Sequence, residues 1–213
     1  MKSNSMQIGV AISGTGSTMQ YLHKSTLSGK LAGKVEMSCI ACNNPKAKGL
    51  EYALRANIPF EVFPKKEFGG NIELRDKAMS DFFFKHGVRY ITLAGYDTEL
   101  TKEFVEPNKG RIINQHPADD LVRFGGHGMC GLRVHEAVLA SDVATTGCTI
   151  HFIDDDPNVI DGGEIIYQHK GIPIYRETDT PEILRQRVLP YEHAVYEEAL
   201  LIIYERFQRS FAF

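Results

Sequence analysis

Short apolar runs alternate with amphipathic stretches along most of this chain. The first four apolar runs cover 7–13, 35–41, 60–63 and 90–94. Runs of this length predict strands, and the helical spacing of apolar residues in 46–56 and 71–86 predicts helices between them. Strand followed by helix, repeated, requires crossover connections and a sheet covered on both faces. The pattern predicts the α/β class, with a mostly parallel twisted sheet and helices on both faces.

Two of the expected helices carry more specific predictions. The apolar side of the helix at 71–86 is expected to hold Leu74, Met79, Phe82 and Phe83. The last helix is expected to begin after Thr180, because threonine is a good N-cap and Pro181 suits the first helical position. Pro190 is expected to break or kink this helix, since proline removes an internal hydrogen bond. The helix then continues over 192–207.

The second half of the chain adds further strands to the same sheet. Residues 112–114 are expected to form another parallel strand, followed by a glycine-rich loop and a short helix that ends near Leu139. The runs 147–153, 165–168 and 172–175 complete the pattern. No repeat or linker divides the sequence, so residues 1–213 are expected to form one domain.

Composition narrows the class of ligand. A net charge of −3 and a pI near 6.2 give no footprint for nucleic acid, and no apolar run is long enough to span a membrane. The cysteines at 39, 42, 130 and 148 fit reduced thiols in the cytoplasm. Cys39 and Cys42 have redox spacing but lie within a strand pattern, which favours a structural role. We expect a cytoplasmic protein with a small-molecule ligand.

The strand at 112–114 ends in the sequence Asn114-Gln115-His116-Pro117. Proline cannot continue a central ladder, so the polar side chains emerge at the carboxyl end of the strand, where α/β sheets bind ligands. Period-two alternation puts Asn114 and His116 on the same side. They could stabilise a developing oxyanion. The alternative is that both residues only cap the strand and bind loop backbone.

A glycine-rich turn follows the first strand and precedes a helical pattern. Its sequence is Ser13-Gly14-Thr15-Gly16-Ser17-Thr18. Glycines let the backbone approach a ligand closely, and free N–H groups at a helix start attract anions. The motif is neither a dinucleotide fingerprint nor a P-loop with its lysine. A phosphate site and a plain tight turn both remain open at this point.

The loop after His116 contains Gly125, Gly126, Gly128 and Gly131. Loops of this composition beside a strand tip are commonly lids or binding loops. The same segment carries His127, Cys130 and His135, but their spacing matches no standard zinc pattern. We therefore expect no metal.

The order of the motifs SGTGS, LAGY, NQHP, TGCTIHF, DGG and RVLPYEHAVY resembles the folate-dependent formyltransferases, as a divergent member. The resemblance runs from about Gln7 to about Tyr204. It implies a Rossmann-like formyltransferase fold and formyl transfer from 10-formyltetrahydrofolate to a primary amine. It assigns catalysis to Asn114, His116 and Asp161, with His151 as a supporting neighbour of the aspartate.

The resemblance also divides the single domain into an N-terminal phosphate-binding half at about 7–110 and a C-terminal catalytic and folate half at about 111–213. The expected contacts to a phosphorylated amine are Gly14, Thr15, Gly16, Ser17, Thr18 and Glu192. The expected contacts to folate are Tyr96, Asp97, Leu100, Asp155, Asp156 and Ile160.

Several positions depart from the family pattern at the substrate rims. Thr18 and Leu189 stand where the family has an asparagine and a glutamine, and the loop after the N-x-H-P motif is several residues longer. The first expected acceptor is phosphoribosylglycinamide, in purine biosynthesis. The alternatives are another phosphorylated or sugar-linked amine, or a folate-binding homologue without turnover. The sequence leaves the oligomeric state, including a homodimer, open.

Overall fold

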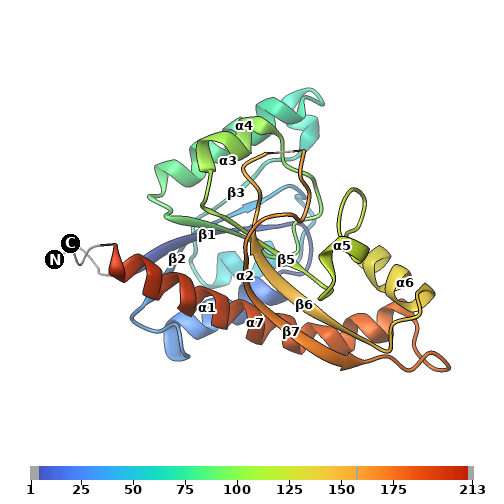
Figure 1. The fold of residues 1–213 in the computed structure, drawn as a ribbon. Helices are drawn as coiled ribbons and strands as arrows, with labels where there is room; N and C mark the ends of the chain where they lie inside the picture. Colours follow the sequence, from blue (N-terminus) through green and yellow to red (C-terminus); the bar gives the residue numbers. More distant parts are fainter. Residues whose placement is uncertain (1–4, 157, 211–213) are drawn as a thin grey trace.

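A mixed sheet of seven strands forms the centre of the computed structural model, which describes residues 5–156 and 158–210. The strand order is β3-β2-β1-β4-β5-β6-β7 (Figure 1). The strands are β1 (Met6–Ile12), β2 (Val35–Cys42), β3 (Phe60–Val62), β4 (Tyr90–Leu93), β5 (Ile112–His116), β6 (Thr145–Phe152) and β7 (Ile165–Pro173). Strands β1 to β5 pair in parallel, whereas β6 runs antiparallel to both β5 and β7. The predicted mostly parallel α/β fold is confirmed.

Helices cover both faces of this sheet. The helices are α1 (Ser17–Ser28), α2 (Gly49–Arg55), α3 (Ile72–Lys85), α4 (Lys102–Val105), α5 (Leu121–Phe124), α6 (Leu132–Ala140) and α7 (Pro181–Arg209), with the short 3-10 helices η1 (Lys65–Phe68) and η2 (Glu106–Asn108). Figure 1 shows α3 and α4 on one face and α1 and α7 on the other. Within 5–156 and 158–210, none of these helices combines the length and apolar character needed to cross a membrane.

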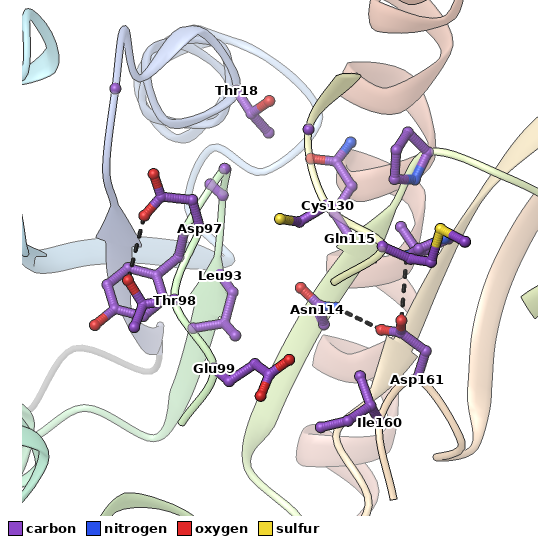
Figure 2. A pocket seen from close by; sticks show the side chains of 18 of the residues that line it. Thr18, Leu93, Asp97, Thr98, Glu99, Asn114, Gln115, Cys130, Ile160 and Asp161 are labelled. Carbon is purple, nitrogen blue, oxygen red and sulfur yellow. Dashed lines mark hydrogen bonds and ion pairs between the residues drawn. The ribbon is translucent and has the colours of Figure 1, made fainter. Parts of the chain in front are cut away.

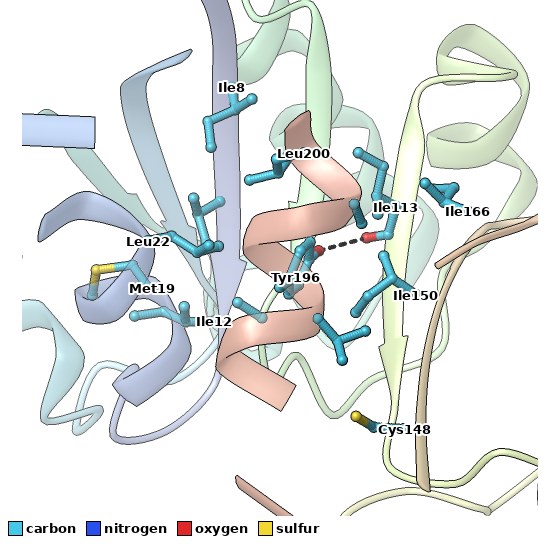
Figure 3. Close-up of a cluster of buried hydrophobic side chains, with 14 of the residues drawn as sticks. Ile8, Ile12, Met19, Leu22, Ile113, Cys148, Ile150, Ile166, Tyr196 and Leu200 are labelled. Atoms are coloured by element: carbon cyan, nitrogen blue, oxygen red, sulfur yellow. Dashed lines mark hydrogen bonds between the residues drawn. The ribbon is translucent and has the colours of Figure 1, made fainter. Parts of the chain in front are cut away.

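Each face of the sheet has its own core, because alternate residues of a strand point to opposite faces. Ile8 and Ile12 belong to the core under α1 and α7, whereas Gly9 faces α3. A Cβ on Gly9 would lie 2.4 Å from the Phe83 ring, so this position has room only for glycine. On the α7 side, the buried hydroxyl of Tyr196 lies 3.1 Å from the carbonyl oxygen of Ile113 (Figure 3). This contact ties the last helix to the centre of the sheet.

The apolar side of α3 differs from the prediction at one position. Met79, Phe82 and Phe83 are buried as expected, but Leu74 is 56% exposed. The buried first turn is instead occupied by Arg75 and Asp76, which form an ion pair with a 2.6 Å N–O distance. Asp76 also accepts a hydrogen bond of 2.7 Å from the backbone N–H of Thr101. The buried side of α3 therefore begins at Arg75 and Asp76, and Leu74 lies outside it.

Pro190, which was expected to break or kink the last helix, does not break it, because α7 is assigned as one helix through this residue. Its start is as predicted, because the hydroxyl of Thr180 accepts a hydrogen bond of 3.3 Å from the N–H of Ile183. Pro190 and Gln186 are both exposed, so water can satisfy the carbonyl that loses its helical partner. Buried residues on either side, Val188 and Val195, hold both segments against the sheet.

The chain reverses its direction of strand addition between β1 and β4. Strands β2 and β3 extend the sheet on one side of β1, and β4 then pairs on its other side. Ligands bind at such switch points, outside the carboxyl ends of the strands. Ser13, directly after β1, donates its N–H to the carbonyl of Gly95 at 3.1 Å and accepts from the N–H of Asp97 at 3.0 Å. These bonds hold the two exit loops together beside the site.

Candidate active site

A cavity of about 640 Å³ opens at the carboxyl ends of β1, β4 and β5. Its walls come from the turn after β1, the loop after β4, the end of β5, the loop before α6, the turn before β7 and the first half of α7. Figure 2 shows Thr18, Asp97, Asn114 and Asp161 around this space. The expected switch-point location is therefore the place where the structure gathers most of the predicted site residues.

Asp161 is the centre of a polar cluster at the end of β5. Its carboxylate accepts hydrogen bonds from the side-chain amide of Asn114 at 3.2 Å and from the N–H of Gly126 at 3.0 Å. The Nδ1 atom of His116 and the Nε2 atom of His151 each lie 3.4 Å from one of its oxygens. Antiparallel pairing of β5 with β6 sets Asn114 opposite His151, which explains why both reach the same carboxylate. The cluster brings together all three residues predicted to be catalytic.

Proton positions in this cluster follow from its carbonyl partners. His116 lies 2.8 Å from the carbonyl oxygen of Phe124 through Nε2, and His151 lies 2.8 Å from that of Phe152 through Nδ1. A carbonyl only accepts, so each of these nitrogens carries a proton. The second nitrogen of each ring is then the one that faces Asp161. His116 can take up a proton at Nδ1, beside a carboxylate that stabilises the resulting cation.

Burial and nearby charges have opposite effects on the pKa values of His116 and Asp161. Burial lowers the pKa of His116, and the Asp161 charge and the bond to Phe124 partly offset that shift. Burial alone would raise the pKa of Asp161, but the nearby His151, His116 and the Gly126 N–H lower it overall. At neutral pH the aspartate is therefore ionised and the imidazole is mainly neutral. This arrangement suits a group that holds a proton only transiently.

The backbone at Asp161 has a left-handed conformation, with φ of 57°. Aspartate and asparagine tolerate this region better than most residues. This conformation directs the Asp161 carboxylate toward β5 and toward the loop that contains Gly125 and Gly126. A Cβ on Gly125 would lie 2.4 Å from the carbonyl oxygen of Leu121 and 3.1 Å from Cβ of Asp161, so the loop can approach only with glycine there.

The glycine-rich turn after β1 lines the cavity as an open helix start. Gly16 has φ of 66° and precedes α1, and no side chain caps this end. Within the described part of the chain, no protein hydrogen bond is found for the N–H groups of Gly16, Ser17 and Thr18. Unpaired N–H groups at a helix start are an anion site, to which the helix dipole adds about 0.3–1 kcal/mol. The geometry thus favours a phosphate site over a plain tight turn.

We expect Gly16→Ala to weaken phosphate binding at least about tenfold, because alanine is strained at this φ and its Cβ would lie 2.9 Å from Met19. Ser17→Ala keeps the N–H and serves as the matched control, with affinity within about twofold. Titration of inorganic phosphate followed by NMR of the loop amides measures both. Equal affinity of the Gly16→Ala variant and wild type would show that the turn is not the phosphate site.

The residues expected to bind folate fall into two groups. Tyr96, Asp97, Leu100 and Ile160 line the cavity. Burial raises the pKa of Asp97, but hydrogen bonds that include those from Asn43 and Thr98 lower it overall, so this carboxylate is ionised. Asp155 and Asp156 do not line the cavity. The former accepts from the N–H of Gly110 at 3.1 Å and the latter from the N–H of Asn158 at 2.9 Å, so both are engaged in loop structure.

Glu192 enters the cavity from α7, beside Leu189. Burial raises its pKa to about 7, and the positive charge of Arg185 opposes that shift. A carboxylate with this pKa is partly protonated near neutrality. It would gain hydrogen bonds from vicinal hydroxyls of a ligand, which favour the ionised form.

A side-chain contact joins the glycine-rich loop before α6 to the loop after β4. His127, in the glycine-rich loop, lies 3.0 Å from a carboxylate oxygen of Glu99 in the loop after β4. Both side chains are exposed, so the pair contributes little stability and can open for a ligand. His127 is thus occupied at the rim, whereas His135 is buried on α6. Over the described residues, no group of three or more His, Cys, Asp or Glu side chains is arranged to hold a metal.

Sequence reasoning missed several polar residues that line this cavity, besides Thr98 and Glu99 in the loop after β4. The others include Gln115, Arg133, His135 as a ligand-facing group, and Arg185. The signal for Arg185 is present in the sequence, because 185, 189 and 192 follow the i, i+4, i+7 spacing of one helical face. Gln115 is inside the N-x-H-P motif but points to the other side of the strand. Arg133 and His135 depend on the path of a long loop, which residue spacing does not give.

Comparison with known proteins places this geometry in a family. A relative named phosphoribosylglycinamide formyltransferase, chloroplastic, from Arabidopsis thaliana is 37% identical over 199 residues, covering 93% of this chain and 65% of the relative. The trifunctional purine biosynthetic protein adenosine-3 from Chironomus tentans is 35% identical over 197 residues, covering 92% of this chain and 14% of the relative. The chain spans less than two thirds of both relatives.

A solved structure agrees over nearly the whole chain. The crystal structure of glycinamide ribonucleotide transformylase 1 from Symbiobacterium toebii matches with a TM-score of 0.84 at 29% identity, covering 96% of this chain and 90% of that one. Residues 6–200 match the family described as formyl transferase. The sequence motifs, the strand order and the cluster around Asp161 therefore have one common explanation, which is that this chain belongs to the formyl transferase family.

Proposed function

We propose that this chain transfers a formyl group from 10-formyltetrahydrofolate to the amine of phosphoribosylglycinamide, a reaction of purine biosynthesis. The observation that carries the proposal is the cluster of Asn114, His116 and Asp161 at the wall of a cavity that also contains an open anion site. Family membership supports formyl chemistry. The four free cysteines of the described chain are consistent with the reducing cytoplasm that we expect.

The folate-facing part of the cavity suits an aromatic heterocycle with polar edges. Tyr96, Leu100, Val105 and Ile160 provide apolar surface there. The hydroxyl of Tyr96 is buried and, among the residues described, has no hydrogen-bond partner. A buried polar group without a partner costs free energy, which a hydrogen bond from a ligand would recover. We propose that this lobe holds the pterin of the folate, with the formyl group directed at Asn114.

The reaction forms a bond between the acceptor nitrogen and the formyl carbon and breaks the bond between that carbon and the folate nitrogen. Bound 10-formyltetrahydrofolate supplies the formyl group. Asn114 donates an amide hydrogen to the oxyanion that develops on the formyl oxygen. One amide hydrogen is engaged by Asp161, while the other makes only a 3.4 Å contact with His151 and can shift to the oxyanion.

Proton transfer falls to the His116–Asp161 contact. The attacking amine loses one proton and the departing folate nitrogen gains one, so the enzyme needs a group that accepts and returns it. Nδ1 of His116 is unprotonated in the neutral ring and faces the ionised Asp161 at 3.4 Å. Asp161 stabilises the cation while His116 holds the proton. The pair thus acts as a relay and leaves its own protonation unchanged over one turnover.

The proposed acceptor is supported by two separated polar features of the cavity. The open helix start at Gly16 to Thr18 fits the phosphate, and Glu192 can accept hydrogen bonds from the two ribose hydroxyls. The names of the Arabidopsis thaliana and Symbiobacterium toebii proteins refer to this acceptor. The direct test is a turnover assay with 10-formyltetrahydrofolate and a panel of phosphorylated and unphosphorylated amines. If the enzyme formylates another amine and does not use phosphoribosylglycinamide, that other amine is the acceptor and the proposal is wrong on this point.

We expect Glu192→Ala to raise the KM for phosphoribosylglycinamide at least about tenfold, which corresponds to about 1.4 kcal/mol, with the KM for folate unchanged. Because burial raises the pKa of Glu192 to about 7, wild-type acceptor affinity should fall as pH drops below about 7. Initial rates between pH 5.5 and 8.5 measure both effects.

The pH profile of the variant is the control for this assignment. The Glu192→Ala enzyme should show no dependence of acceptor affinity on pH through about 7, since the titrating group is gone. Leu189→Gln adds an amide beside Glu192 and should lower the acceptor KM. If the Ala variant keeps the wild-type KM and pH profile, Glu192 does not bind the acceptor.

A further inference from the structure

Gln115 is a polar residue of β5 that the proposed chemistry does not use. Neighbouring residues of a strand point to opposite faces, so Gln115 shares a side with Ile113 rather than with Asn114. Ile113 belongs to the core under α7, and Ile112 to the core under α3. Gln115 therefore enters the cavity from the α7 side. In Figure 2 it lies beside Cys130 and apart from the Asn114–Asp161 contact.

The side-chain amide of Gln115 is held without a partner. Its Nε2 atom is buried and makes no hydrogen bond within residues 5–156 and 158–210. Gln168 on β7 shows the usual arrangement, because its Nε2 atom donates to the carbonyl of Asp119 at 2.8 Å and to the hydroxyl of Thr149 at 2.7 Å. A buried amide hydrogen without an acceptor is unfavourable in the free protein. A ligand oxygen in the cavity would satisfy it.

A second nitrogen of this cavity's lining is also without a hydrogen-bond partner among the described residues. The side chain of Leu189 on α7, which lines the same cavity, has no hydrogen-bonding atoms. His135 on α6 is 2% exposed, and its Nδ1 atom is also buried without a partner among the described residues. Two unpartnered nitrogens from different elements thus line the cavity whose α7 wall carries Glu192. Such an arrangement is expected of a ligand site and not of a packed core.

We propose that Gln115 is a specificity-determining residue for the acceptor, whose side-chain amide donates a hydrogen bond to a carbonyl or hydroxyl oxygen of that molecule. This inference rests on the proposed function. The acceptor binds on the α7 side of β5 through Gln115 and Glu192. Asn114 and Asp161 act on the transferred group from the other side. One side of β5 thereby binds the acceptor, and the other side acts on the formyl carbon.

The test compares Gln115→Met, which keeps the length and apolar stem of the side chain, with the matched variant Gln168→Met. Gln115→Met should raise the KM for phosphoribosylglycinamide at least about tenfold, with kcat and the folate KM within about twofold. The Tm of its free form should equal or exceed that of wild type, because no hydrogen bond is lost. Gln168→Met should instead lower Tm and leave the acceptor KM unchanged.

A second variant tests the direction of the hydrogen bond. Gln115→Glu keeps the length but lacks donor hydrogens at neutral pH, so it should also raise the acceptor KM at least about tenfold. Wild-type KM in either variant, or a lower Tm of free Gln115→Met, would overturn the assignment. Failure of the proposed function is distinct, because wild type itself would then not formylate this acceptor, whereas the Tm comparison would still report whether Gln115 is free.

Discussion

Asp161→Asn is expected to lower kcat at least about 100-fold while the KM values for acceptor and folate stay within about twofold. The carboxylate organises Asn114, His116 and the Gly126 N–H at once, and its negative charge stabilises a proton on His116. An asparagine fits the space but carries no charge. Asparagine also tolerates the left-handed backbone at this position, so the loss should lie in chemistry and not in folding.

Asp142→Asn is the matched control for removal of one carboxylate. Asp142 is exposed and pairs with Arg123 at the surface, away from the cavity, so its variant should have wild-type kcat. Steady-state rates and thermal unfolding of both variants make the comparison. Turnover of Asp161→Asn within a few fold of wild type would remove Asp161 from the proton relay.

The pH dependence of kcat adds a check on the same pair. Since its surroundings lower the pKa of Asp161, the carboxylate stays ionised down to pH values below its ordinary range near 3.8. Any loss of kcat between pH 5 and 7 must therefore come from another group, such as protonation of His116. Stability from ionised Asp161 is present above the unfolded pKa and is lost only as pH falls through the lower folded value.

Gly163→Ala is expected to lower the free energy of unfolding by about 1–3 kcal/mol, or Tm by about 2–12 °C, and kcat at least about tenfold. A Cβ at Gly163 would lie 1.9 Å from the carbonyl oxygen of Phe152. That contact involves backbone at the end of β6, where the N–H of Phe152 donates to the carbonyl of Glu164 at 2.9 Å. The chain must move, and Asp161 is two residues away.

Gly162→Ala is the control next to it. Its Cβ would lie 2.4 Å from a methyl group of Val159, but that side chain is 40% exposed and can rotate. We expect a Tm within about 2 °C of wild type. Thermal unfolding and initial rates on the two alanine variants settle the comparison. Equal stability of both would mean that the turn before β7 absorbs the extra carbon without disturbing the cluster.

Most of the fold could be predicted because its signals are local. Apolar runs gave the parallel strands, and Thr180 marked the start of α7 correctly. The errors come from interactions between distant residues. Leu74 is exposed because a buried ion pair of Arg75 with Asp76, bonded to Thr101, takes the inner position. Pro190 stays within the helix because packing on both sides outweighs one lost hydrogen bond.

The candidate site also contains residues that local sequence signals predict and residues that depend on the folded structure. Asn114 and His116 share a strand, so alternation placed them correctly, and the motif order added Asp161. Gln115 was missed because sequence spacing shows which face a residue takes but not whether its hydrogen bonds are satisfied. The position of Asp155 and Asp156 away from the cavity depends on the fold of their own turn. Their role in folate binding stays a prediction.

The contact between Tyr196 and the carbonyl of Ile113 has a consequence for synthesis on the ribosome. Part of the cover on one face of β1, β4 and β5 lies in α7, which packs there beside α1, and domains fold as units during translation. Until α7 has left the exit tunnel, the nascent chain lacks this part of the cover over Ile8, Ile12 and Ile113. We therefore expect stalled chains that lack α7 to recruit chaperones, and release of the helix to end that recruitment.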